Sequence, residues 1–259
     1  MFKSLIKYSG TGNKFILVDD RDGSMANITT EAIALSESHD VDGVLLMQSS
    51  NEADIKMRII NRDGSEAEMC GNGARCAAHW AHHEAELPAQ FSMQTGAGAV
   101  EASVSENIVK VKLTNPINFR LVPEISVPNA LGAPAYIDTG VPHLVSEVNA
   151  VLDLDIESVG AMVRNHPSLA PKGANASFYA LNEGGIQCRV FERGVEGETL
   201  SCGTGSAACA LIASLNHELT SPIKVLVQSG DILNIYFDHN ESGFKDVYLE
   251  GPVEILERI

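Results

Sequence analysis

Short runs of apolar residues recur along the whole chain and are separated by Gly, Asn, Asp and Pro. Such runs, bounded by turn-forming residues, predict β-strands. The chain is therefore expected to be rich in short strands. The expected strands are 2–8, 15–19, 44–48, 54–60, 91–95 and 109–114 in the first half, and 143–147, 178–181, 186–191, 223–227 and 232–237 in the second.

Helical periodicity is confined to a few segments. Amphipathic helices are expected at about 29–38 and 156–165, and one further helix is expected after Cys70 and another after Cys202. Residues 207–215 are apolar almost all the way round, and a helix without a polar face must be buried on every side. A curled, mostly antiparallel sheet around each central helix meets that need, so the predicted fold class is α/β.

The two halves of the chain repeat the same order of motifs. Residues 69–78 (MCGNGARCAA) and 201–210 (SCGTGSAACA) each place a cysteine before a glycine-rich turn and an alanine-rich helix. Upstream of them, 58–62 (RIINR) lines up with 189–193 (RVFER), and 11–18 lines up with 139–145. The offset is 189 − 58 = 131 for the first pair and 202 − 70 = 132 for the cysteines, so the order is kept along a half-chain. This pattern predicts a tandem duplication.

The duplication predicts two pseudo-symmetric lobes. The first lobe is expected to cover 1–115 and the second 116–251, with the boundary at the Asn-Pro that follows the strand 109–114. The sequence leaves open whether the tail, 252–259, returns to the first lobe.

The charge balance excludes two classes of partner. The formal net charge is −16, and no cluster of Lys and Arg occurs, so neither nucleic acid nor an anionic membrane is an expected partner. The N-terminal residues lack the apolar run of a signal peptide, and no later stretch is long enough to span a bilayer. Five cysteines, an odd number without regular spacing, are expected to be reduced. Together these features predict a cytoplasmic protein.

The two repeated cysteines are the candidate chemistry. The backbone N–H groups and the dipole at a helix N-terminus favour negative charge, so Cys70 and Cys202 are expected to have depressed pKa values and to be reactive. If both meet one small molecule, one thiolate can remove a proton from a carbon while the other thiol delivers a proton from the opposite face, without cofactor or metal. Backbone amides at the two helix starts would stabilise the charge that develops on a carboxylate. The expected donors are Gly71, Asn72, Gly203 and Thr204.

These motifs allow other interpretations. The segment 203–205 lacks the Lys-Ser/Thr that closes a phosphate-binding loop. A histidine-rich stretch, 76–83, could hold a metal, but no second ligand pair with zinc-like spacing occurs, and a solvated helix end is the favoured interpretation. A cysteine-based metal-binding or redox module is kept as the alternative from another functional class. Cys76, Cys188 and Cys209 are expected to be buried packing residues.

Several long motifs in one order resemble the diaminopimelate epimerase family, and the resemblance covers nearly the whole chain. The matching stretches are GTGN at 10–13, NxDGSE at 61–66 followed by MCGNGARC at 69–76, GVPH at 140–143, Asn175, ERG at 192–194, and ETxxCGTG at 198–205. The resemblance implies a homodimeric isomerase that converts L,L- to meso-2,6-diaminopimelate, in lysine and peptidoglycan biosynthesis, without pyridoxal phosphate or any other cofactor.

The family motifs also imply a role for individual residues. Cys70 and Cys202 correspond to the acid/base pair, and His143 and Glu192 to groups that tune the thiols and interact with the reacting amine. Arg193 is suited to grip a distal carboxylate in a two-pronged ion pair. The residues implied to bind substrate are Asn13, Asn61, Gly71, Asn72, Asn175, Glu192, Arg193, Gly203 and Thr204.

Three positions depart from the family pattern. Lys14 stands where the family usually has Asp, Gly43 where some members have Gln, and Val141 where Asn is frequent. These departures leave the expected reaction unchanged but keep a second hypothesis open. The chain could instead be a racemase of the same fold that acts on another amino acid, such as histidine.

Overall fold

The computed structural model describes residues 5–25 and 27–259, which divide into two compact units. Unit 1 comprises Met1–Lys112 and Glu250–Ile259, and unit 2 comprises Leu113–Leu249. Residues 2–4 of the first expected strand lie outside the described residues. Each unit is described by itself below.

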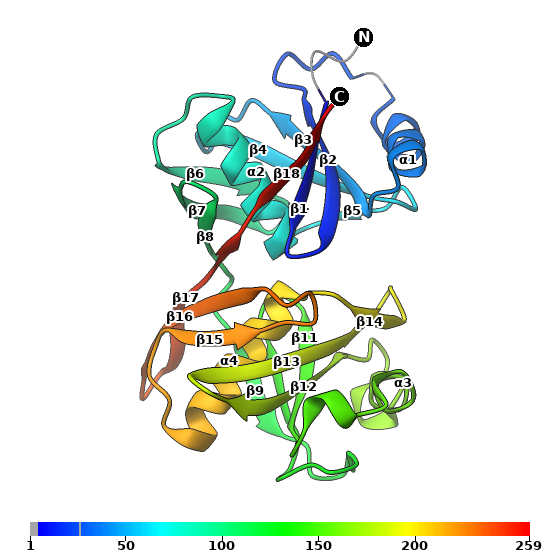
Figure 1. Cartoon of the computed structure of the whole chain (residues 1–259), viewed down its shortest axis with the longest axis vertical. Helices are drawn as coiled ribbons and strands as arrows, with labels where there is room; N and C mark the ends of the chain where they lie inside the picture. Colours follow the sequence, from blue (N-terminus) through cyan, green and yellow to red (C-terminus); the bar gives the residue numbers. More distant parts are fainter. Residues whose placement is uncertain (1–4, 26) are drawn as a thin grey trace. The chain divides into compact units, whose positions relative to one another are not determined.

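The described residues of unit 1 form one sheet and two helices (Figure 1). Hydrogen bonds order its strands β18–β1–β2–β3–β4–β6–β7–β8, with β5 added to β4. The pairs β2–β3 and β4–β6 are parallel and the others are antiparallel. The elements are β1 (Leu5–Gly10), β2 (Asn13–Asp19), α1 (Ile28–His39), β3 (Gly43–Gln48), β4 (Ile55–Asn61), β5 (Glu66–Ala67), α2 (Gly71–His83), β6 (Gln90–Thr95), β7 (Gly98–Ser105), β8 (Ile108–Lys112) and β18 (Glu254–Arg258).

Unit 2 repeats this arrangement. Its strand order is β9–β10–β11–β12–β13–β15–β16, with β14 added to β13, and the parallel pairs are β11–β12 and β13–β15. Strand β17 (Gly243–Pro252) crosses the division between the units. The elements are β9 (Ile117–Leu121), β10 (Ala135–Asp138), β11 (Pro142–Glu147), α3 (Ile156–Arg164), β12 (Asn175–Asn182), β13 (Gly185–Glu192), β14 (Gly197–Thr199), α4 (Gly203–His217), β15 (Ile223–Leu226) and β16 (Ile232–Asn240), with short 3₁₀ helices at Val151–Asp153 and Pro167–Leu169.

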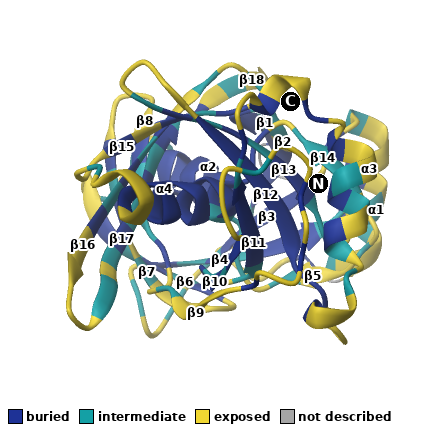
Figure 2. Ribbon diagram, turned by 90° about the horizontal axis from the view of Figure 1, so that it is seen from below, coloured by how far each residue is buried: buried dark blue, intermediate teal, exposed yellow. Residues whose placement is uncertain are grey.

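In each unit the sheet curls around the helix that follows the cysteine. Helix α2 contacts β1 and β2 near one edge of its sheet and β7 and β8 at the other, and α4 similarly contacts strands from β10 to β16. Figure 2 shows both helices coloured as buried over most of their length. Their sequences are rich in Ala and Gly, so the strands approach closely on all sides. The predicted α/β class and duplicated architecture are confirmed.

Strand register fixes which residues are equivalent in the two units. Phe15 pairs with Gly43 across β2 and β3, and His143 pairs with Asn175 across β11 and β12. The pairing continues into the next strands, where Val44↔Ile60 corresponds to Ala176↔Phe191. Phe15 and His143 are therefore counterparts. In the same way Asn61 corresponds to Glu192, Gly43 to Asn175, and Asn13 to Val141.

Several strands were not predicted from the sequence. These are β7, β9, β10, β17, the two short strands β5 and β14, and β18. β18 lies in the tail whose position the sequence left open, and it pairs with β1 of unit 1. Among the described residues, no helix is long and apolar enough to cross a membrane.

Candidate active site

Cys70 lies at the N-terminus of α2, where it is the N-cap residue. Its backbone is extended, with φ −142° and ψ 118°, so the side chain turns back over the first helical turn. The Gly73 N–H donates to the Cys70 sulfur at 3.4 Å, and the thiol lies 3.7 Å from Oδ1 of Asn13. Gly73 packs closely here, because a Cβ would lie 3.1 Å from the Leu45 side chain, which would have to shift slightly. The sulfur is half-buried and held in place by the backbone of its own helix.

Two asparagines near this helix start are fixed by local hydrogen bonds. The Asn13 side chain donates to Asp42, which also accepts the backbone N–H of Lys14 at 2.8 Å. Asn61, at the end of β4, donates through Nδ2 to the Ser65 hydroxyl at 3.0 Å. Each amide side chain therefore has a set orientation in unit 1.

Cys202 occupies the equivalent N-cap of α4, but its surroundings differ. The residue is only 7% exposed, and its sulfur lies 3.6 Å from the Thr204 hydroxyl. Burial raises the pKa of the Cys202 thiol well above its usual value, and the charge of Glu192 raises it further. The expectation of a depressed pKa is wrong for Cys202, because loss of water and a nearby carboxylate outweigh the helix amides.

Glu192, at the end of β13, is the acidic neighbour of Cys202. Burial raises the pKa of its carboxyl group, while hydrogen bonds from Thr199 and Cys202 act in the opposite direction. The Thr199 hydroxyl donates to Glu192 Oε1 at 2.6 Å. A thiol and a carboxyl group in contact titrate as a unit, so the charge on Glu192 and the proton on Cys202 depend on each other.

His143 is fully buried between two hydroxyl groups. Its Nε2 lies 3.1 Å from the Thr204 hydroxyl and its Nδ1 lies 2.9 Å from the Ser177 hydroxyl. Burial lowers the pKa of His143 to about 3, with a smaller contribution from the positive charge of Arg193. The imidazole is therefore neutral at physiological pH. It connects to Cys202 through the Thr204 hydroxyl, which contacts both.

Asn175 and Arg193 are held together in unit 2. Asn175 Oδ1 accepts the backbone N–H of Arg193 at 2.8 Å. The Arg193 guanidinium makes only long hydrogen bonds, of 3.4 and 3.5 Å, to the carbonyls of Lys172 and Gly173. It forms no ion pair with any residue that the structure describes. A half-buried guanidinium of this kind retains donors for a carboxylate.

The three departures from the family pattern have separate structural settings. The Lys14 side chain is exposed. A Cβ at Gly43 would lie 2.6 Å from the Ile60 carbonyl oxygen, so a glutamine does not fit there without movement of the backbone. Val141 stands at the position that Asn13 occupies in the other unit. Only one unit therefore offers an amide side chain at this position.

The histidine-rich end of α2 is less solvated than expected. His79 is 8% exposed, and its Nδ1 lies 3.3 Å from the Tyr8 hydroxyl, so the favoured interpretation is wrong for this residue. His82 and His83 each bond a backbone carbonyl. Within the described part of the chain, no group of three or more His, Cys, Asp or Glu side chains could hold a metal ion. Cys76, Cys188 and Cys209 are buried, as predicted.

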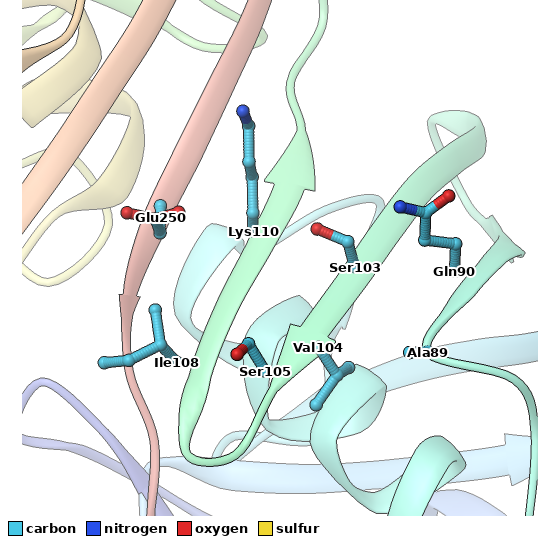
Figure 3. A pocket seen from close by; sticks show the side chains of 8 residues that line it. All are labelled: Ala89, Gln90, Ser103, Val104, Ser105, Ile108, Lys110 and Glu250. Carbon is cyan, nitrogen blue, oxygen red and sulfur yellow. The ribbon is translucent and has the colours of Figure 1, made fainter.

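A shallow pocket lies elsewhere in unit 1, along β7 and β8 (Figure 3). None of the predicted site residues is among those that line it: Ala89, Gln90, Ser103, Val104, Ser105, Ile108, Lys110 and Glu250.

The sequence did not single out several residues that contact the candidate groups. Thr199 holds Glu192, Ser177 holds His143, and Arg75 and Thr11 contact Asn72. Thr199 and Arg75 lie inside the motifs that were recognised, and Thr11 belongs to the repeated Thr-Gly turn. Ser177 carries no signal, because a serine within an apolar strand has no distinctive spacing.

Comparisons with known proteins agree along nearly the whole chain. A sequence model of the family described as diaminopimelate epimerase matches residues 5–117 and 135–256. The chain is 37% identical to the diaminopimelate epimerase of Hydrogenobaculum sp. (strain Y04AAS1), covering 96% of this chain and 94% of that protein. It is 36% identical to the diaminopimelate epimerase of Aquifex aeolicus (strain VF5), covering 95% and 93%.

Solved structures share the fold at much lower identity. A Bacillus anthracis phenazine biosynthesis protein of the PhzF family superposes with a TM-score of 0.79 at 17% identity, covering 99% of this chain and 97% of that one. A hydroxyproline epimerase from Agrobacterium vitis gives a TM-score of 0.68 at 13% identity, covering 100% and 93%. These likenesses establish the architecture.

Proposed function

Because the chain belongs to the diaminopimelate epimerase family, we propose that it is an isomerase that interconverts L,L- and meso-2,6-diaminopimelate. The proposal includes a two-base mechanism in which Cys70 and Cys202 act on one α-carbon from opposite faces. No cofactor takes part in this mechanism.

The observation that carries the proposal is the matched placement of the two cysteines. Each is the N-cap of the buried central helix in its unit, directly before a glycine-containing turn. Removing a proton from the α-carbon of an amino acid puts charge on its carboxylate. The first helical hydrogen bonds are donated to Cys70 O and Cys202 O, each at 2.8 Å. The residues that donate these bonds are preceded by the backbone amides of Gly71, Asn72, Gly203 and Thr204. Preorganised donors of this kind stabilise such charge.

The surroundings of the two thiols support a different acid/base role for each. Cys202 lies beside Glu192 and a neutral His143 linked by Thr204, which favours the protonated thiol in the resting enzyme. Cys70 receives a backbone N–H at its sulfur, and the Asn13 amide lies beside it. We therefore assign Cys70 the role of resting base and Cys202 that of resting acid. The roles exchange when the reaction runs in reverse.

The distal end of the substrate carries a second amino-acid head. Arg193 is assigned to its carboxylate, because its guanidinium is half-buried and lacks an ion pair among the described residues. Asn13, Asn61 and Asn175 are assigned to further polar groups of the substrate. These side chains already have fixed orientations.

The deciding experiment is α-proton exchange in deuterated water with purified protein and a panel of amino acids. Diaminopimelate is expected to exchange and to change configuration, and Cys70→Ala and Cys202→Ala are each expected to abolish the change of configuration. Cys76→Ala, which alters a buried cysteine of α2 that is not assigned to the reaction, serves as a matched control. Exchange of a different amino acid, with none of diaminopimelate, would instead support the racemase hypothesis.

Assembly and location complete the proposal. We propose a homodimer, supported by the exposed apolar side chains of the edge strand β9, where Ile117, Phe119 and Leu121 are 58%, 53% and 61% exposed. Sedimentation equilibrium measures this directly. We also propose a cytoplasmic location, supported by the five free cysteines and by the place of the reaction in lysine biosynthesis.

A further inference from the structure

Arg75 is the largest fully buried side chain of the described residues, and it lies just behind the Cys70 end of α2. Its Nη1 donates to the Gly71 carbonyl at 3.4 Å and to Asn72 Oδ1 at 3.1 Å. Its Nη2 donates to the Thr11 hydroxyl at 3.0 Å. One guanidinium therefore joins the first turn of α2 to the turn between β1 and β2.

A cation at this place is unfavourable on general grounds. A buried charge loses its hydration, and a positive charge near a helix N-terminus opposes the helix dipole. Arg75 is 0% exposed and lies in the second turn of α2. Its retention therefore calls for a compensating role.

The duplicated unit shows that the fold itself does not require an arginine here. With the cysteine offset of 202 − 70 = 132, the counterpart of Arg75 is Ala207, which is also buried. In unit 2 the Thr139 hydroxyl donates directly to the Thr204 carbonyl at 3.0 Å, so the turn meets the helix without a bridge. In unit 1, Thr11 takes the place of Thr139; its hydroxyl has only a long direct contact with Asn72 Oδ1, at 3.5 Å, and Arg75 donates to both Thr11 and Asn72 at 3.0 and 3.1 Å.

The bridged turn also differs in backbone conformation. Thr11 has φ 54°, in the left-handed region that a β-branched residue rarely adopts, and Gly12 after it has φ 91°; of their counterparts in unit 2, Thr139 and Gly140, only Gly140 is left-handed. Asn13 follows two residues after Thr11, and its Oδ1 lies 3.7 Å from the Cys70 sulfur. The position of Asn13 beside the thiol thus depends on a strained turn whose hydroxyl is anchored by Arg75.

We propose that Arg75 is a positioning residue for the Cys70 half of the reaction: its guanidinium sets the spacing between the β1–β2 turn, which carries Asn13, and the helix start, which carries Cys70 and Asn72. This inference rests on the proposed function for its kinetic consequence. The structural part concerns unit 1 alone. Unit 2 needs no such bridge, so the effect is specific to one of the two thiols.

The test uses Arg75→Met and Arg75→Lys in the full chain, with two readouts. The first is steady-state epimerisation of diaminopimelate, where both variants are expected to lose about tenfold or more in kcat with a smaller change in KM, because misplacing a reacting group slows chemistry more than binding. Lysine keeps the charge but has no fork to reach both Thr11 and Asn72, so it is expected to remain defective. Met93→Ala, a buried change on β6, controls for lost stability and is expected to keep its kcat.

The second readout needs no substrate and therefore stands if the proposed function fails. Iodoacetamide labelling, followed by peptide mass spectrometry, gives the alkylation rates of Cys70, Cys202 and Cys76 in one digest. Alkylation of Cys70 is expected to change about fivefold or more in both variants, because the spacing between its sulfur and the Asn13 side chain is no longer fixed. Cys202 is expected to keep its rate, and buried Cys76 to stay unreactive, which shows that α2 remains folded.

Three results would overturn the inference. One is a kcat within twofold of the parent protein in both variants. Another is an unchanged Cys70 alkylation rate, or an equal change at Cys70 and Cys202. The third is full recovery by Arg75→Lys, since that would show that charge alone is needed and not the bridge.

Discussion

Nε2 of His143 lies 3.1 Å from the hydroxyl oxygen of Thr204, and that oxygen lies 3.6 Å from the sulfur of Cys202. A hydroxyl group can donate one hydrogen bond and accept two. When Cys202 is a thiolate, the Thr204 hydroxyl can donate to the sulfur while a neutral His143 donates to Thr204. When Cys202 is a thiol, its S–H can donate to the Thr204 hydroxyl, which still accepts from Nε2 of His143. Thr204 can therefore follow the charge on the sulfur.

Replacing Thr204 by valine removes this hydroxyl and keeps the shape of the side chain. We expect Thr204→Val to lower kcat/KM for diaminopimelate by about 10- to 100-fold, the usual contribution of a hydrogen bond to a charged group. Steady-state kinetics in both directions measures the loss. Thr204→Ser restores the hydroxyl and is expected to recover most of the activity. Equal activity of the valine variant and the parent protein would show that the hydroxyl does not serve the sulfur.

Glu192 is expected to hold Cys202 in its protonated form. In Glu192→Gln the negative charge that raises the pKa of the Cys202 thiol is removed, so this pKa should fall. At pH 7.5 we expect alkylation of Cys202 by iodoacetamide to become several-fold faster, while epimerisation slows because the resting acid is lost. Alkylation of Cys70 in the same sample is the internal control. Slower alkylation of Cys202 would mean that Glu192 acts on it mainly as a proton acceptor.

The repeat in the sequence predicted more of the fold than the strand pattern did. Arg58 and Arg189 are repeated positions in the sequence, and Glu66 and Glu198 each lie four residues before their cysteine. The structure joins them into two equivalent ion pairs, Arg58–Glu66 and Arg189–Glu198, each with contacts of 2.7–2.8 Å. A duplicated sequence identifies positions that share a role, but the partner of each position lies on another strand. Only the register of the sheet reveals it.

Two of the strands that were missed, β9 and β18, lack the usual pattern of burial. All five residues of β9 are exposed, and most of β18 is exposed too, so neither shows an alternation of apolar and polar positions. The same limit applies to the chemistry. The helix start at Cys202 is visible in the sequence, but the burial of the sulfur and the approach of Glu192 result from tertiary packing. These two effects reverse the direction of the expected pKa shift.

Arg193 is expected to bind a substrate carboxylate through its planar fork. Arg193→Lys keeps the charge but cannot form the two parallel hydrogen bonds, so we expect a loss of about 1.5 to 3 kcal/mol in kcat/KM for diaminopimelate. The loss should appear mainly in KM if Arg193 binds the carboxylate equally well in the ground state and in the transition state. Arg62→Lys, at the repeated position in unit 1, is the matched control, because Arg62 is exposed and paired with Asp40 at 3.0 Å. An unchanged specificity constant in Arg193→Lys would remove Arg193 from the binding site.

The buried His143 should make stability depend on pH in mildly acidic solution. Its pKa is about 3 in the folded protein, against about 6.5 in an unfolded chain, so between these values the unfolded state binds a proton that the folded state does not. The contribution of His143 to stability is therefore complete above pH 6.5 and is lost as the pH falls toward 3. The free energy of unfolding should decrease by up to about 1.4 kcal/mol per pH unit from this residue, and His79, with a pKa of about 4, should add to the slope.

The measurement is urea unfolding between pH 5 and 8 of the parent protein and of His143→Phe, which places at this position the residue found at its counterpart, Phe15. At pH 8 a histidine is neutral in both states, so the difference between the two proteins there reports packing and lost hydrogen bonds alone. Between pH 6 and 5 the free energy of unfolding of the variant is expected to fall less steeply than that of the parent protein. The two slopes should differ by about 1.4 kcal/mol per pH unit, the value for one proton. Parallel curves for the two proteins over this range would show that His143 takes up its proton in the folded state, and the neutral imidazole assigned to the Thr204 contact would be wrong.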